Sequence, residues 1–360
     1  MHTSNSPRIQ ELQKLIRSQK LDALLVTSPS DWYYLTGFTG ESGVLIADRR
    51  SLALVTDGRF TVQANEEVRG ASVVEHKDGL YRTCGELLKK RQTKVVGFDA
   101  NVLTIAQSQI LKKAAGKATR FQPAAGLVQN LRTRKDSVEL AQMRKAARLA
   151  SEVMESAITM LKPGIREFEI AAEIEYQMRK RGASGAAFES IVAFGARAAL
   201  PHARPTAKRL RKNELVVLDL GAILGQYCSD ITRTVYVGKA PPKIRLWYQA
   251  VLEAQSAAIN AIRPGETCEM VDAAARSVLA TYRLEQHFVH STGHGLGLEV
   301  HEEPRLAKNQ KTQLATGNVV TVEPGVYFAG VGGIRIEDDV AVHQSGSEIL
   351  TRASRDFTEI

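Results

Sequence analysis

Two pairs of carboxylates stand in stretches of sequence that otherwise have the composition of buried strands. The first pair is Asp219 and Asp230, and the second pair is Glu323 and Glu337; apolar or β-branched residues surround each of them. Carboxylates that lie close together in an apolar setting repel one another unless a proton or a cation compensates their charge. Two such pairs in one chain are most simply explained by bound metal ions.

The spacing within each pair predicts a β-hairpin that brings its two acids face to face. If the chain turns at Leu224 and Gly225, the members of the first pair lie directly opposite each other, with Cβ atoms about 5 Å apart. A turn centred on Gly330 does the same for the second pair. Asp338 and Asp339, which follow the second pair, are expected to face solvent. The alternative is that the registers differ and that the four acids face solvent as well.

Histidines in one short segment could complete a metal site. Three of the eight histidines are His290, His294 and His301, and Gly293 and Gly295 leave the imidazole between them accessible. The glycines argue against a helix, and so against the helical zinc motif with histidines four residues apart. Four carboxylates and His294 form a hard, oxygen-rich set that suits manganese and related divalent ions. This set is too large for one tetrahedral zinc ion, but it can hold two ions that share a bridging water.

The region that carries these residues contains an internal echo. Pro163 and Gly164 recur about 100 residues later as Pro264 and Gly265, a period too long for a solenoid. A long helical pattern precedes each copy, and a shorter one follows it at residues 166–181 and 268–282. The two acid pairs keep nearly the same offset. We therefore expect two similar α/β halves that face each other, each contributing one acid-bearing hairpin.

Residues 1–131 have the pattern of a separate α/β domain. A helix-like stretch opens at Ser28 and Pro29 and ends at Gly37. Short apolar runs bounded by turn residues predict strands at residues 23–26, 43–46, 52–55 and 95–98.

The basic stretch 132–135 is interpreted as the linker to a second domain, residues 132–360. Asp136, with Glu139 three residues later, has the pattern of a helix capping box. The helix that follows carries an apolar stripe beginning at Val138 and Ala141, and it ends before Pro163.

Composition argues against several other classes of protein. The 360 residues are 44% hydrophobic and 24% charged, as in a soluble globular protein. No apolar run is long enough to span a bilayer, and the N-terminus has no apolar signal core. The three cysteines are far apart and form neither a disulfide framework nor a zinc motif. These features predict a cytoplasmic protein with reduced thiols and no membrane partner.

The net charge of +9 would be compatible with a nucleic-acid partner. The densest basic run, residues 208–212, contains no aromatic residue for base stacking, and no nucleic-acid motif surrounds it. We interpret this run as a solvated loop and expect no nucleic-acid partner.

At the acid pairs and the histidines the sequence resembles the M24 metallopeptidases, the pita-bread family. The matching segments are residues 217–221, 229–234, 291–295, 321–325 and 333–338. Residues 1–131 look like the creatinase-type N-terminal domain. The resemblance implies an α/β (α+β) fold in which this N-terminal α/β domain is followed by a pseudo-twofold pita-bread catalytic domain, residues 132–360. Every metal-ligand position is filled, which disfavours the metal-free relatives.

The resemblance also implies the composition of the site. The metal ligands would be Asp219, Asp230, His294, Glu323 and Glu337, holding two divalent ions, with Mn²⁺ favoured over Co²⁺ or Zn²⁺. The catalytic residues would be His202, His290, His301, Glu323 and Arg335. Glu323 would move the proton of the attacking water, and His301 would donate a hydrogen bond to the developing oxyanion. His202 and His290 would line the pocket. Arg335 would bind either a ligand carboxylate or the substrate.

Within the family, residues 201–205 and 333–337 look like the Xaa-Pro peptidases. This implies cleavage of proline-containing peptides at the bond between an N-terminal residue and proline. Some strict dipeptidases carry, at the position of Asn309, an arginine that holds the substrate carboxylate. Its absence favours an Xaa-Pro aminopeptidase, with an Xaa-Pro dipeptidase (prolidase) as the alternative and a non-catalytic interaction protein as the least favoured hypothesis. The family resemblance also suggests a homodimer.

Overall fold

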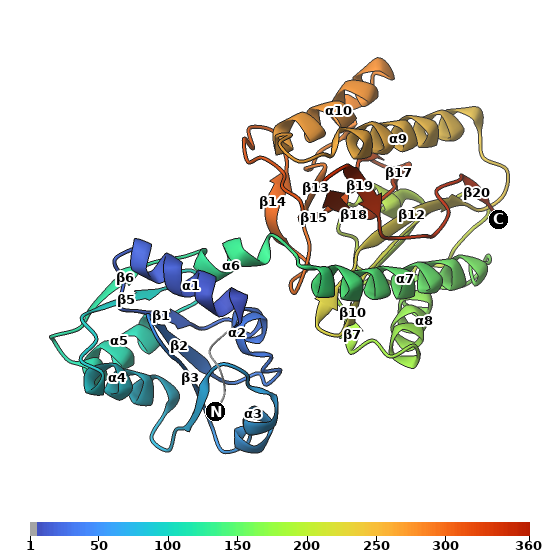
Figure 1. The fold of residues 1–360 in the computed structure, drawn as a ribbon. Helices are drawn as coiled ribbons and strands as arrows, with labels where there is room; N and C mark the ends of the chain where they lie inside the picture. The colour runs from blue at the N-terminus through green and yellow to red at the C-terminus, as the bar shows by residue number, and fades with distance from the viewer. Residues whose placement is uncertain (1–5) are drawn as a thin grey trace. The chain divides into compact units, whose positions relative to one another are not determined.

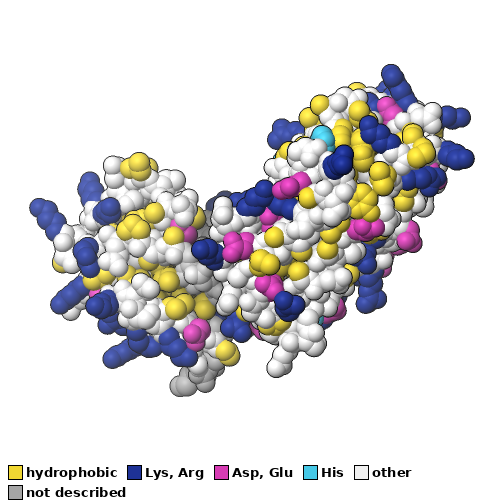
Figure 2. Space-filling view, turned by 90° about the horizontal axis from the view of Figure 1, so that it is seen from above, with side chains coloured by type: hydrophobic (Ala, Val, Ile, Leu, Met, Phe, Trp, Pro, Cys, Tyr) yellow, Lys and Arg dark blue, Asp and Glu magenta, His cyan; other side chains and the backbone are white. Residues whose placement is uncertain are grey.

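The computed structural model describes residues 6–360. The chain divides into two compact units, Met1–Arg132 and Thr133–Ile360, and Figure 1 shows that strands form the centre of each. No helix within residues 6–360 is long and apolar enough to cross a membrane. On the face shown in Figure 2, Lys and Arg side chains are spread over the surface of both units. The net charge of the chain is +9.

The first unit is a six-stranded sheet with helices packed against it (Figure 1). The strands are β1 (Ala23–Val26), β2 (Val44–Asp48), β3 (Leu52–Thr56), β4 (Ser72–Glu75), β5 (Val95–Phe98) and β6 (Arg120–Pro123). The helices are α1 (Pro7–Ser18), α2 (Pro29–Thr36), α3 (Thr61–Glu67), α4 (Leu80–Lys90), α5 (Ile105–Ala115) and α6 (Leu127–Arg132). The strand order is β4-β3-β2-β1-β5-β6, with β1 parallel to β5 and antiparallel to β2.

The strands predicted for the first unit are confirmed. Residues 23–26 and 95–98 coincide with β1 and β5, and the other two predictions differ from β2 and β3 by one or two residues at their ends. The predicted helix is α2, which ends where Gly37 takes a left-handed conformation with φ of 79°. Glycine adopts this conformation without steric cost, which is why it so often follows the last residue of a helix.

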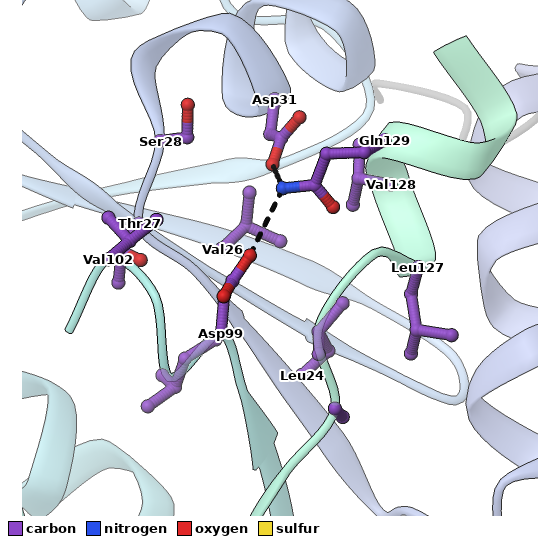
Figure 3. Close-up of a pocket in the computed structure, with 12 residues that line it drawn as sticks. Leu24, Val26, Thr27, Ser28, Asp31, Asp99, Val102, Leu127, Val128 and Gln129 are labelled. Atoms are coloured by element: carbon purple, nitrogen blue, oxygen red, sulfur yellow. Dashed lines mark hydrogen bonds between the residues drawn. The ribbon is translucent and has the colours of Figure 1, made fainter. Parts of the chain in front are cut away.

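Buried polar contacts fasten α6 to Asp31 in α2 and to Asp99, which follows β5. Figure 3 shows the amide of Gln129 between Asp31 and Asp99; its nitrogen donates to Asp31 at 2.8 Å and to Asp99 at 3.3 Å. Arg132 donates to the other carboxylate oxygen of Asp31 at 2.7 Å, and both side chains of this ion pair are almost fully buried. These contacts fix the last helix of the first unit.

The second unit has two halves that each begin with a pair of helices. The first half contains α7 (Ser137–Thr159), α8 (Glu167–Lys180), β7 (Gly185–Ala186), β8 (Ile191–Phe194), β9 (Leu215–Leu220), β10 (Ala222–Leu224), β11 (Tyr227–Cys228) and β12 (Ile231–Tyr236). The second half contains α9 (Pro242–Ala261), α10 (Cys268–Thr281), β13 (Gly293–Gly295), β14 (Glu302–Leu306), β15 (Val319–Val322), β16 (Gly325–Phe328), β17 (Gly332–Arg335), β18 (Asp338–His343) and β19 (Gly346–Ile349). A last strand, β20 (Thr358–Glu359), pairs with β12.

The echo in the sequence corresponds to a structural repeat. The N–H of Gly164 donates to the carbonyl of Leu210 at 2.9 Å, and the N–H of Gly265 donates to that of Leu314 at 2.8 Å. Both glycines have positive φ, 98° and 87°. The main sheets have the orders β20-β12-β9-β8 and β14-β13-β15-β18-β19, so β9–β12 in one half corresponds to β15–β18 in the other. The expected arrangement of two similar α/β halves is confirmed.

Helix α7 begins as predicted, but its buried stripe does not. The carboxylate of Asp136 accepts from the N–H groups of Val138 and Glu139 at 2.9 Å each, and the carboxylate of Glu139 accepts from the N–H of Asp136 at 3.0 Å. Val138 is 75% exposed and Ala141 is exposed, so the stripe begins at Met143 instead. The first turn is held by its cap and by Glu139, which is 3% exposed and accepts from the Tyr227 hydroxyl at 2.9 Å.

The first acid pair is not directly opposed, so the register predicted for it is wrong by two residues. Asp219 lies opposite Thr232 in the β9–β12 ladder, because the turn falls at Gly225 and Gln226, one residue later than predicted. Both turn residues have positive φ, 56° and 72°, as a two-residue type I′ turn requires. A shift of two residues preserves the face of a strand, so Asp219 and Asp230 remain on the same side of the sheet.

The register predicted for the second acid pair agrees with the strands on either side of it. Val322 pairs with Asp338 in β15–β18, and Gly325 pairs with Arg335 in β16–β17, so both ladders have the same register. Glu323 and Glu337 therefore lie opposite each other, between the end of one ladder and the start of the other. The turn residue Gly330 has φ of 77°, which glycine tolerates.

We predict that Asp136→Ala lowers the free energy of unfolding by about 1 kcal/mol, because two N–H groups of the first turn of α7 lose their acceptor. Urea unfolding measures this change. Lys145→Ala, at an exposed position of the same helix, is the control and should change the free energy by less than about 0.5 kcal/mol. Equal effects of the two substitutions would contradict a stabilising cap.

Candidate metal centre

Strand ends from both halves of the second unit carry the five predicted metal ligands. They are Asp219 in β9, Asp230 immediately before β12, His294 in β13, Glu323 immediately after β15, and Glu337 between β17 and β18. Asp219, Asp230 and Glu337 are buried, whereas His294 and Glu323 are partly exposed. We call these five side chains the cage; it is closed on the side of the buried acids and open on the other.

The distances within the cage suit shared coordination of a cation. Ligand atoms of Asp230, His294 and Glu337 all lie within 4.8 Å of one another. Two ligands on opposite sides of a divalent ion stand about 4.2 Å apart when each bond is about 2.1 Å long. The Nε2 atom of His294 is also 3.5 Å from Glu323 Oε1 and 3.9 Å from Asp230 Oδ2. The imidazole therefore borders carboxylates from both acid pairs.

The ring of His294 is held in the orientation that a metal ligand needs. Its Nδ1 donates to the carbonyl of Gly295 at 3.0 Å, because a carbonyl oxygen can only accept. The lone pair of the neutral ring is then on Nε2, which faces the acids. Burial is the main cause that lowers the pKa of His294, to about 4. The imidazole is therefore neutral at pH 7, the form that binds metal ions.

The carboxylates of the cage cannot all carry full charge without a cation beside them. Burial is the largest cause that raises the pKa of Asp230, followed by the charges of Glu337 and Asp219. Burial, Glu323 and Asp219 raise the pKa of Glu337 in the same way. Burial also raises the pKa of Glu323. The repulsion that raises these pKa values is relieved by a bound cation as well as by a proton.

Two buried oxygens of the cage show that the residues present fit a metal ion. Asp219 Oδ1 and Asp230 Oδ1 have no hydrogen-bond partner within residues 6–360. Buried polar atoms in proteins are almost always satisfied, so these two oxygens are available to a bound metal ion. Carboxylate oxygens with one neutral imidazole are the donors that manganese and related divalent ions prefer.

Arg335 is buried and holds a carboxylate of the cage. Its Nη2 donates to Asp219 Oδ2 at 2.5 Å, and its Nε donates to the hydroxyl of Thr232 at 3.1 Å. The Thr232 hydroxyl donates in turn to Glu337 at 2.6 Å. The arginine side chain is only 4% exposed. This geometry matches the first of the two roles expected for Arg335, the binding of a ligand carboxylate.

Tyr327 connects Arg335 to His290, and the sequence analysis missed it. Its hydroxyl accepts from Arg335 Nη1 at 2.9 Å and donates to His290 Nε2 at 2.8 Å. The other ring nitrogen of His290 donates to the carbonyl of Ser291 at 2.8 Å. Burial and then the charge of Arg335 lower the pKa of His290 to about 4. Tyr327 lies four residues after Glu323, so the two-residue period of strands was the signal that could have identified it.

The other two predicted histidines are exposed, and they lie near His294 and His290. The ring of His301 packs edge-on against that of His294, with 4.5 Å between the ring centroids. Burial and then the charge of His202 lower the pKa of His301. All the histidines predicted for the site therefore gather around the cage.

Asp338 and Asp339 are each only 1% exposed, so the expectation that they face solvent is wrong. Arg233, another residue the sequence analysis missed, donates to Asp338 Oδ1 at 2.8 Å and to the carbonyl of Glu337 at 2.6 Å. Asp339 Oδ2 accepts from the N–H of Asp230 at 3.1 Å. Both acids are buried because they bind groups next to the cage: Asp338 binds the Arg233 side chain, and Asp339 binds the N–H of Asp230. Their partners lie about 100 residues away, beyond the reach of a local pattern.

Family models match both units of the chain. Residues 141–344 match the model of metallopeptidase family M24, and residues 8–134 match that of the creatinase/prolidase N-terminal domain. The first range contains every residue predicted for the site.

Similarity to individual proteins extends over nearly the whole chain. An uncharacterized peptidase of Bacillus subtilis is 37% identical over 97% of this chain and 99% of its own length. An Xaa-Pro dipeptidase from Bacillus anthracis has a similar structure, with a TM-score of 0.95, 36% identity, and coverage of 98% of this chain and 99% of the other. An X-Pro aminopeptidase from Thermotoga maritima gives a TM-score of 0.88 and 33% identity, covering 96% and 100%.

We predict that Asp230→Asn stabilises the metal-free protein and weakens its response to Mn²⁺. The amide removes a charge that burial and neighbouring acids disfavour, and each pKa unit of that penalty corresponds to about 1.4 kcal/mol. Thermal unfolding should give a higher Tm in chelator and a smaller rise on addition of Mn²⁺. Asp78→Asn, at an exposed position, should leave both quantities unchanged. An undiminished response of Asp230→Asn to Mn²⁺ would show that Asp230 is not a ligand.

Proposed function

Because this chain belongs to metallopeptidase family M24, we propose that it hydrolyses the bond between an N-terminal residue and a following proline. The observation that carries the proposal is the complete cage of acids and imidazole in a chain that resembles an Xaa-Pro dipeptidase over 98% of its length. A homodimer and a cytoplasmic location remain predictions from the sequence.

The five side chains of the cage would hold two divalent ions. Mn²⁺ is the first choice because carboxylates outnumber imidazoles among the ligands. The bound ions would polarise the scissile carbonyl and make an attacking water more acidic. The side chains of the protein supply the remaining chemistry.

Glu323 is the proposed carrier of the proton. Its side chain is 17% exposed, more than the other three carboxylates of the cage, so it can reach a substrate on the open side. Burial raises its pKa, which makes the carboxylate a stronger base near neutral pH. It would accept a proton from the attacking water and deliver it to the proline nitrogen, which must be protonated to leave.

His301 is the proposed donor to the oxyanion that forms on the scissile carbonyl. It is exposed and packs against His294, so a carbonyl bound beside His294 would face it. One such donor contributes about 10²- to 10³-fold to kcat. His202 and His290 are proposed to line the substrate pocket next to it.

Three observations bear on the length of the substrate, and they do not agree. Asn309 is uncharged and cannot pair with a terminal carboxylate as arginine does, which supports an aminopeptidase that accepts longer peptides. The similarity to the Xaa-Pro dipeptidase supports dipeptides, and the similarity to the X-Pro aminopeptidase supports longer ones. We place the aminopeptidase first, because Asn309 belongs to this chain, and the dipeptidase second.

The test compares Gly-Pro, Xaa-Pro-Pro and Met-Ala peptides after loading with Mn²⁺. Fastest hydrolysis of the tripeptide is expected, and chelated protein should be inactive. Fastest hydrolysis of Gly-Pro would favour the dipeptidase, whereas a preference for Met-Ala would contradict proline specificity. Retention of Mn²⁺ without hydrolysis of any of the three would support a non-catalytic role.

We predict that Glu323→Ala and His301→Ala fail in different ways. Glu323→Ala should abolish turnover and weaken Mn²⁺ binding, because the same carboxylate is ligand and base. His301→Ala should keep its Mn²⁺ and lower kcat by about 10²- to 10³-fold, because it loses only a hydrogen-bond donor. Steady-state kinetics and calorimetric Mn²⁺ titration separate the two. Full activity of the first variant, or an unchanged kcat of the second, would remove the role assigned to that residue.

A further inference from the structure

A buried ion pair on α10 touches the segment that carries His290. Arg276 Nε lies 2.7 Å from Asp272 Oδ2, one helical turn earlier, and the two side chains are 12% and 1% exposed. Neither residue belongs to the cage or to the residues predicted to contact substrate. An ion pair of this kind usually stabilises the helix itself, but most of the contacts of this one lie outside α10.

Arg276 binds two carbonyl groups of the backbone segment that leads into the site. Its Nη1 donates to the carbonyl of Phe288 at 3.2 Å, and its Nη2 donates to the carbonyl of His290 at 2.6 Å. The guanidinium also lies 4.3 Å from the centre of the Phe288 ring. The guanidinium group therefore contacts residues 288–290 and Asp272.

Asp272 holds the next part of the same segment with its other oxygen. Asp272 Oδ1 accepts from the N–H of Thr292 at 3.2 Å and from its hydroxyl at 2.7 Å. The carbonyl of Thr292 accepts in turn from the N–H of Glu323 at 2.8 Å. The ion pair is thus connected by hydrogen bonds to one residue of the pocket and one residue of the cage.

The segment also has neutral contacts: the N–H of Thr292 is shared with the carbonyl of Leu306 at 2.9 Å, and the His290 ring is bonded to the Tyr327 hydroxyl at 2.8 Å. It lies between a short 3₁₀ turn and β13, outside the regular ladders, and Val289 within it is 68% exposed. Charge-assisted hydrogen bonds are about twice as strong as neutral ones. The contacts from α10 are the charge-assisted ones among those that hold the segment, so their loss should displace it, and a displacement of about 1 Å at a reacting group can cost about 100-fold in rate.

We propose that Asp272 and Arg276 are positioning residues of the peptidase: they hold residues 288–292 so that the His290 imidazole and the Glu323 backbone stay in place. The proposal rests on the proposed function for the role of His290. A purely structural ion pair would differ from it, because its loss would lower stability and leave the kinetics of the folded enzyme unchanged.

A cavity of about 500 Å³ gives solvent access to this pair. It is lined by Asp272 and Arg276 themselves and by residues of α10 and two nearby loops, among them Met270, Glu285 and Lys308. Removal of the arginine side chain would leave a space next to this cavity with a carboxylate and two carbonyl groups around it. A small guanidinium ion can enter from solvent and replace the missing group, which makes chemical rescue possible.

The experiment uses the Mn²⁺-loaded Arg276→Ala enzyme and the best peptide of the wild type. We expect kcat/KM to fall by about 10- to 100-fold, with Mn²⁺ affinity within a few-fold of wild type. Ethylguanidinium should restore part of the activity, whereas ethylammonium should not, because an ammonium group cannot bind the planar arrangement of acceptors. Arg276→Lys should be intermediate for the same reason. Arg144→Ala, which breaks a half-exposed pair with Glu348, is the control and should show neither loss nor rescue.

Hydrogen exchange provides a readout that does not depend on any substrate. The N–H groups of Thr292 and Glu323 should exchange faster in Arg276→Ala and should be protected again by ethylguanidinium. This outcome would stand even if the wild type cleaved none of the proline peptides, which would refute the proposed function alone. Unchanged exchange, or kcat/KM within twofold of wild type, would overturn the positioning role. A fall in Tm and Mn²⁺ affinity without rescue would reduce the pair to a structural one.

Discussion

The crowding of buried carboxylates around one imidazole is the constraint on which the second unit depends. Water cannot solvate Asp219, Asp230 and Glu337, which are buried, so cations or protons must compensate their charge. Arg335 provides one fixed cation by binding Asp219 Oδ2. The partnerless oxygens of Asp219 and Asp230 remain for a metal ion. In the proposed metal-bound protein, a bound ion would relieve the repulsion between these carboxylates.

The fold must hold these acids together against that repulsion. Each half of the repeat supplies one pair, and hydrogen bonds between the halves bring the pairs together: the N–H of Glu337 donates to the carbonyl of Thr232 at 3.2 Å, and the N–H of Asp230 donates to Asp339 at 3.1 Å. Arg233 then fastens the halves: it binds Asp338, the carbonyl of Glu337 and two carbonyls of the C-terminal segment, at Ala353 and Ser354. Removing one partner of a buried ion pair typically costs about 3–5 kcal/mol because the other charge is left uncompensated, so Arg233 and Asp338 depend on each other.

His290 is the point where two supporting networks meet. Next to the cage, Arg335 donates to the hydroxyl of Tyr327, which donates in turn to the ring of His290. From α10, Arg276 holds its carbonyl. The ring orientation thus depends on the interior of the site, whereas the backbone position depends on an ion pair next to a solvent-filled cavity. Substitutions in the two networks should therefore affect the same residue by separable routes.

Local patterns were sufficient to predict several features of this protein. The strands of the first unit, the cap of α7 at Asp136 and the candidate ligands follow from residue type and short spacing, and the repeat follows from motifs that recur about 100 residues apart. Even the error in the first hairpin preserved the face of Asp219, because the shift was an even number of residues. The turn itself depended on which residues adopt positive φ, and Gln226 does so without being a residue type that favours it.

Other features depend on partners that are distant in the chain. Whether Asp338 and Asp339 are buried depends on Arg233 and on the N–H of Asp230, each more than 100 residues away. The connection of Tyr327 to His290 and the contacts of Arg276 with residues 288–290 likewise form only when separate segments pack together. A polar group can be buried only where a partner meets it, and the position of that partner is a property of the folded chain.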